Sequence, residues 1–145
     1  VEEIENDGSI YKDKNVEVIA FKNDHGDFEN SFGFLFITKD KRILFSGDTG
    51  VSDNLMNYGE NLDILVHEVY SSETFKNKTD DWQIYHNAHH TSSIDLGIIA
   101  NKLKPKKLVL SHILFWGATE ESLLDDVKSN FDGNAIIAKD LMVIR

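Results

Sequence analysis

The sequence predicts a single α/β domain, of mixed α/β and α+β character, with a mixed sheet flanked by helices. Two apolar, β-prone runs at residues 32–38 and 42–46 are joined by a short polar turn, which indicates a hairpin. The second half of the chain alternates helical and extended patterns, which places helices beside the sheet. With 145 residues, 41% of them hydrophobic, the chain is long enough to form the core of one such domain.

The first half supplies most of the predicted strands. Residues 1–15 are polar and acidic, and we assign them to an N-terminal segment outside the domain of residues 16–145. Residues 16–21 are mostly apolar and β-branched, which predicts a strand before the hairpin. After the hairpin, a helical turn is expected at residues 53–58 and a short strand at residues 62–66.

The second half contains two predicted helices. Apolar spacing favours a helix over residues 91–104, and Pro105 ends it. Its N-cap is one of three adjacent hydroxyl residues: Thr91, Ser92 or Ser93. A strand is expected at residues 107–111, followed by an amphipathic helix at residues 119–131 and two short strands that close the chain.

Composition excludes several classes of protein. The formal net charge of −10 disfavours a nucleic-acid surface unless bound metal ions supply positive charge. The absence of cysteine excludes disulfides, thiolate metal sites and a cysteine nucleophile. No apolar run reaches the roughly 18–20 residues of a membrane span, and the acidic start is unlike a signal peptide. We therefore expect a soluble, cytoplasmic protein.

Histidines and carboxylates recur at the ends of predicted strands. The set consists of His25, Asp48, Glu68 and His112. If the strands share one sheet, these side chains converge on one rim, which is an arrangement suited to metal chemistry. Simpler readings stay open: His25 as an exposed loop residue, Asp48 as an Asx-turn or helix N-cap, Glu68 and its neighbour His67 as core residues, and His112 as an accidental strand-end histidine.

A histidine-rich segment lies between the two halves of the chain. His86 and His90 have the i, i+4 spacing that chelates zinc on a helix. However, the segment immediately precedes a capped helix start, so we interpret it as a loop, and it lacks the glutamate of a metalloprotease motif. A loop histidine that acts as an acid fits better.

Four short motifs, taken in order, resemble the later motifs of the metallo-β-lactamase superfamily, especially its ribonuclease Z-like branch of phosphodiesterases. They are Asp24-His25-Gly26, Ser46-Gly47-Asp48-Thr49, His67-Glu68-Val69-Tyr70 and Ser111-His112. The stretch from His90-Thr91-Ser92 through the next helix to the strand before His112 is also similar to that branch.

The resemblance implies the C-terminal half of a four-layer αββα sandwich and a site with two zinc ions. By this similarity His25, Asp48 and His112 bind metal, with Asp48 bridging the two ions. The attacking group is a metal-activated hydroxide. His90 is implied to act as a general acid that Glu68 orients. The implied substrate is a phosphodiester, with RNA one candidate, or another small ester.

One departure from the family is large, because its His-x-His-x-Asp-His motif is absent. We expect that motif in an upstream half of the same fold, preceding Val1. The chain alone should then bind metal weakly, show little turnover and self-associate through exposed apolar sheet surface. The alternative is a non-catalytic, partner-binding module or a degenerate homologue without metal.

Overall fold

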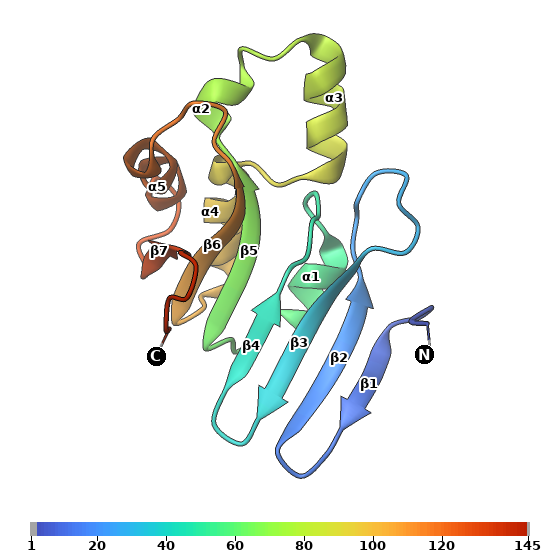
Figure 1. Cartoon of the computed structure of the whole chain (residues 1–145). Coiled ribbons are helices and arrows are strands. Elements are labelled where there is room, and N and C mark those ends of the chain that lie inside the picture. Colours follow the sequence, from blue (N-terminus) through green and yellow to red (C-terminus); the bar gives the residue numbers. More distant parts are fainter. Residues whose placement is uncertain (1–2, 145) are drawn as a thin grey trace.

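The computed structural model, which describes residues 3–144, shows one seven-stranded mixed sheet (Figure 1). The strands lie in the sheet in chain order, from β1 to β7. The antiparallel part consists of β1 (Gly8–Lys12), β2 (Val16–Lys22), β3 (Phe32–Thr38) and β4 (Arg42–Phe45). Parallel pairing then adds β5 (Ile64–Tyr70), β6 (Lys107–Leu114) and β7 (Ala135–Ile137). The predicted mixed sheet with flanking helices is confirmed.

Helices make the crossovers that the parallel strands require. They are α1 (Asp53–Tyr58) between β4 and β5, then α2 (Ser72–Phe75), α3 (Asp80–His89) and α4 (Ser93–Leu103) between β5 and β6, and α5 (Glu120–Lys128) before β7. As predicted, α4 begins at a hydroxyl cap, because the Ser92 side chain accepts a hydrogen bond from the Asp95 amide. None of the helices within residues 3–144 combines the length and apolar character that crossing a membrane requires.

The core lies between one face of the sheet and the helices. Leu35 pairs with Leu44, Leu44 with Leu65, and Leu65 with Leu108, so all four side chains point to the same face. All four are buried and form one cluster with Leu96 of α4. Each such leucine stabilises the fold by roughly 1.5–3 kcal/mol.

The opposite face of the sheet is also apolar but is not covered by a helix within the described part of the chain. Phe34 pairs with Phe45, and Phe36 pairs with Ile43, so these four side chains share that face with Val66. Phe45 is 41% exposed, and the other four are partly buried. We call these five residues the open face.

Two strand predictions differ from the structure. Strand β1 lies inside the polar N-terminal segment and pairs with β2, although most of its side chains are exposed. Because an edge strand of exposed residues needs no apolar alternation, its sequence carries no strong strand signal. At the other end only β7 follows α5 within the described residues, so the prediction of two closing strands was wrong.

The histidine-rich segment is a helix rather than the predicted loop. Helix α3 begins after Thr79 and has two acidic residues, Asp80 and Asp81, in its first turn, where the helix dipole favours negative charge. His89 is the only buried residue of this helix. A helix without an apolar stripe escapes a test based on hydrophobic periodicity, which is why the loop prediction was wrong.

Candidate metal centre

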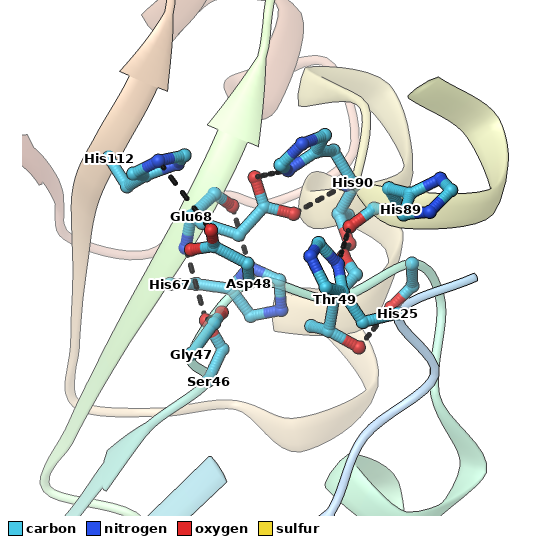
Figure 2. Close-up of polar contacts among 12 residues, drawn as sticks. His25, Ser46, Gly47, Asp48, Thr49, His67, Glu68, His89, His90 and His112 are labelled. Carbon is cyan, nitrogen blue, oxygen red and sulfur yellow. Dashed lines mark hydrogen bonds and ion pairs between the residues drawn. The ribbon is translucent and has the colours of Figure 1, made fainter. Parts of the chain in front are cut away.

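The candidate site lies at one edge of the sheet because four strands point the same way. Strands β4, β5 and β6 are parallel, and β2 shares their direction because two antiparallel pairings separate it from β4. Their carboxyl ends therefore meet at one edge. Figure 2 shows His25, Asp48, Glu68, His90 and His112 gathered there. All of these residues except His90 belong to the set predicted at strand ends.

Asp48 lies in the turn that follows β4. Gly47 before it has a φ of 64°, and a Cβ on that glycine would lie 2.5 Å from the Phe32 carbonyl oxygen, so no larger residue fits without a shift. The Asp48 side chain is 41% exposed and has one carboxylate oxygen 3.6 Å from Nε2 of His112. The N-cap of the next helix is Ser52, so Asp48 does not cap it.

His112 is aimed by a β-bulge. In the pairing of β5 with β6, Ser111 is opposite Glu68 and Ile113 is opposite Val69, which leaves His112 as an extra residue. Its φ of 42° is in the left-handed region, a conformation that re-aims a side chain out of the normal alternation. The sequence predicted His112 at the end of a strand. In the structure β6 continues to Leu114, so His112 lies within it.

His90 ends α3 and is held by Glu68. Its Nδ1 lies 3.3 Å from Oε2 of Glu68, a side chain that is only 1% exposed. The other Glu68 oxygen accepts a hydrogen bond of 2.6 Å from the Thr91 amide. Burial raises the pKa of Glu68, while its contacts with His90 and Thr91 oppose that rise. Since Nδ1 faces Glu68, the Nε2 atom of His90 is the one left for other partners.

Three side chains form a group that fits a metal ion. One ligand atom from each of Asp48, His90 and His112 lies within 4.8 Å of the others. The rings of His90 and His112 are stacked with centroids 5.8 Å apart. Two imidazoles and one carboxylate are donors that zinc prefers, and three protein ligands leave a coordination position open for water or substrate.

His25 borders this group without belonging to it. Its Nδ1 lies 2.7 Å from the His89 carbonyl oxygen, and its ring meets the edge of the His90 ring at 5.4 Å. The sequence predicted His25, Asp48 and His112 as the ligands. The structure therefore brings Asp48 and His112 together and adds His90, with His25 beside it.

The other histidines have structural surroundings. His67 is fully buried, its Nδ1 donates to the Glu68 carbonyl oxygen at 2.6 Å, and burial lowers its pKa to about 4. His89 uses both ring nitrogens, toward the Tyr85 carbonyl oxygen and the Asp27 carboxylate. His86 lies on α3 against aromatic rings and is not in the metal-compatible group of the described residues.

Sequence reasoning missed the residues that support these side chains. The Ser46 hydroxyl accepts a hydrogen bond of 3.1 Å from the Glu68 amide, which ties β5 to the turn that carries Asp48. The Thr91 hydroxyl donates to the Thr49 carbonyl oxygen at 2.7 Å, which ties the same turn to His90. Hydroxyl residues are common in turns, so only their neighbours in space reveal these roles.

Known proteins are similar to this chain in sequence and in fold, although no protein-family model matches the chain. Ribonuclease Z of Bacillus velezensis is 34% identical over 142 residues, which cover 94% of this chain and 43% of that enzyme. Ribonuclease Z of Archaeoglobus fulgidus is 30% identical over 103 residues, covering 70% of this chain and 31% of its own length.

Solved structures agree on the fold. A metallo-β-lactamase fold protein from Bacillus subtilis superposes with a TM-score of 0.74 at 20% identity, over 91% of this chain and 50% of that one. The short form of human tRNase Z gives a TM-score of 0.66 at 22% identity, over 97% and 47% of the two chains. The chain spans about a third to a half of the length of these relatives. It is thus a ribonuclease Z-like chain with a partial metallo-β-lactamase fold.

Proposed function

We propose that this chain is part of a metal-dependent phosphodiesterase in which Asp48 and His112 bind a divalent metal ion, with zinc preferred. His90 is the proton donor for the leaving group. The observation that carries this proposal is the convergence of Asp48, His90 and His112 at one edge of the sheet. The donor set fits such an ion, because it combines imidazole nitrogen and carboxylate oxygen at a partly open position.

A bound zinc ion would supply a Lewis acid and lower the pKa of a bound water molecule to about 7. The chain's own residues position the rest of the reaction. Glu68 faces Nδ1 of His90, which favours a proton on that nitrogen and leaves Nε2 to exchange a proton with substrate. His90 is about one-tenth exposed, so its ring is held in place by its surroundings. A proton donor fixed beside the metal ligands is suited to protonating a departing alkoxide.

A phosphodiester, with RNA as the first candidate, is the proposed substrate because the matched enzymes are ribonucleases Z. A net charge of −10 repels an anionic substrate unless cations neutralise the reacting phosphate. The proposed metal supplies that charge locally. In a protein that joins this chain to a His-x-His-x-Asp-His motif, the residues of that motif, together with Asp48 and His25, would hold a second ion.

Zinc titration of this chain by calorimetry tests the ligand assignment. We expect Asp48→Ala to weaken zinc binding at least about tenfold, because it removes a direct ligand. Asp40→Ala removes an exposed carboxylate from the turn between β3 and β4 and serves as the matched control, with unchanged affinity. Equal zinc affinity of Asp48→Ala and the unmodified chain would contradict the proposed metal centre.

The role of His90 is tested separately, in a protein that contains the upstream motif. His90→Ala should retain zinc but lower the rate of phosphodiester hydrolysis by roughly 10²–10⁴-fold, the usual range for removal of a general acid. The loss should be smaller for a substrate whose leaving group needs no proton, such as a nitrophenolate. If the variant instead loses its zinc, His90 is a third ligand and not the acid.

A non-catalytic binding module is the competing function, and the open face favours it. A protein recruited through Phe36 and Phe45 would cover apolar surface that no described helix covers. The two functions differ in metal content. The binding module predicts no stoichiometric zinc even when the upstream motif is present, whereas the phosphodiesterase requires it.

A further inference from the structure

A cluster of aromatic rings lies beside the metal-compatible group and has no role in it. Trp82 and His86 come from α3, and their rings are stacked with centroids 5.3 Å apart. Trp116 follows β6, and its ring lies 4.6 Å from that of His86. The rings of Tyr70 and Phe75 pack against Trp116, with centroids 5.5 and 6.4 Å from the centroid of its ring. We call Trp82, His86 and Trp116 the aromatic patch.

The aromatic patch is continuous with the proposed catalytic residues. The ring of His86 lies 5.7 Å from that of His90, and His90 in turn stacks on His112. A strand whose phosphate sits at Asp48 and His112 could therefore continue past His90 to His86, the ring that both tryptophans contact.

The chemistry of the aromatic patch suits a nucleobase better than an aliphatic ligand. Trp82 stacks on His86 through one face yet remains 54% exposed, which leaves indole surface open to solvent. The ammonium of Lys78 lies 4.3 Å from the centre of the Trp116 ring. An aromatic surface combined with a cation is the pairing that binds single-stranded nucleic acid, since bases stack on the rings and phosphates approach the charge.

Packing alone accounts for only part of this arrangement. Tyr70 is almost fully buried and Phe75 is partly buried, so these two rings do contribute to holding α2 against β5 and β6. Trp82 is different, because its ring contacts are with Tyr85 and His86 of its own helix and it is 54% exposed. A tryptophan kept at the surface next to a binding site is typical of a recognition residue.

We propose that the aromatic patch, together with Lys78, binds the base of a nucleotide adjacent to the scissile phosphodiester, with Trp82 as the stacking surface. This inference rests on the proposed phosphodiesterase function and adds to it a stacking subsite for an unpaired base of the substrate strand. The stacking is not selective for one base, because every base presents a π-face. The patch therefore sets the position of the strand rather than its sequence.

Fluorescence tests the inference without any turnover. The chain has two tryptophans, Trp82 and Trp116, and both belong to the aromatic patch, so intrinsic emission reports directly on it. The probes are a single-stranded oligoribonucleotide and, for comparison, ribose 5-phosphate, both added in the presence of a chelator. We expect the oligoribonucleotide to quench the emission in a saturable manner and ribose 5-phosphate to have no effect.

Variants then locate the binding. Trp82→Ala should weaken oligoribonucleotide binding, followed by the emission of Trp116, by about tenfold, and Trp82→Phe should restore most of the affinity. Tyr11→Ala is the matched control, because Tyr11 is also 54% exposed but lies on β1, at the far edge of the sheet. Its affinity should equal that of the unmodified chain.

Either of two results would overturn the inference: equal quenching by ribose 5-phosphate, or unchanged affinity in Trp82→Ala. These results leave the proposed phosphodiesterase standing if zinc binding still depends on Asp48. Conversely, base-dependent quenching in a chain that never binds zinc would sustain the nucleotide site and remove the catalytic proposal. The failure of one proposal can therefore be distinguished from the failure of the other.

Discussion

His67 is buried within β5 with no exposed surface, and it illustrates how burial controls the charge of a single residue. Burial lowers its pKa from 6.5 to about 4, although its hydrogen bond to the Glu68 carbonyl oxygen partly opposes this. Neighbouring residues in β5 point to opposite faces, so His67 enters the core side while Glu68 faces His90. Two adjacent residues thus have different roles for a reason of strand geometry.

The stability of the protein should depend on pH through His67. The unfolded imidazole takes up a proton near pH 6.5 and the folded one only near pH 4, so stability is lost as the pH falls between these values. The shift corresponds to about 3 kcal/mol. Urea unfolding at a series of pH values should show a steeper loss for the unmodified chain than for His67→Gln. Parallel curves for the two proteins would refute the assignment.

At the scale of elements, α4 and α5 approach each other through a glycine. A Cβ on Gly97 of α4 would lie 2.5 Å from the Val127 carbonyl oxygen of α5 and 3.1 Å from the Asn130 side chain. A backbone atom cannot move aside as easily as the end of a flexible side chain. Glycine therefore allows a close helix contact here, despite its poor helix propensity.

Gly97→Ala is accordingly expected to destabilise the protein, although alanine is the better helix former. The overpacking should lower the free energy of unfolding by about 1–3 kcal/mol. Asn101→Ala is the control, since Asn101 is exposed on the same helix and its replacement should change stability by less than about 0.5 kcal/mol. Thermal unfolding of both variants provides the measurement. A stabilised Gly97→Ala would mean that the helices separate at little cost.

At the scale of the whole molecule, the sheet has one covered face and one open face. The open face contains five apolar residues at neighbouring positions, defined above, and Phe36 and Phe45 form an edge-to-face pair at 5.6 Å. Next to it, Phe34, Asp48 and His112 line one hollow of about 200 Å³. Whatever covers the open face therefore also borders the candidate metal centre.

We therefore expect this chain to self-associate through the open face. Sedimentation velocity should show larger species as concentration rises, because apolar surface is buried on association. A Phe36→Ser and Phe45→Ser double variant should shift the distribution towards the monomer. Tyr11→Ser, on the edge strand β1, should leave it unchanged. A chain that stays monomeric at all concentrations would contradict this prediction.

The sequence by itself determined most local structure. The hairpin of β3 and β4, helix α1, and a start of α4 at one of the hydroxyl residues 91–93 follow from apolar runs, capping chemistry and the stop at Pro105. Asp48 and His112 were candidates from sequence, because each lies next to an apolar, β-prone run and in a motif that resembles the metallo-β-lactamase superfamily. These signals are local: each depends on residues a few positions apart along the chain.

Tertiary structure decided what the sequence left open. The bulge that turns His112 towards Asp48 depends on how β6 pairs with β5, and His90 joins them because Glu68 and Thr91 hold the end of α3. Strand register and the contact between Glu68 and His90, which are 22 positions apart, produce no periodic pattern in the sequence. Element types are therefore readable from local chemistry, whereas membership of a site is set by long-range packing.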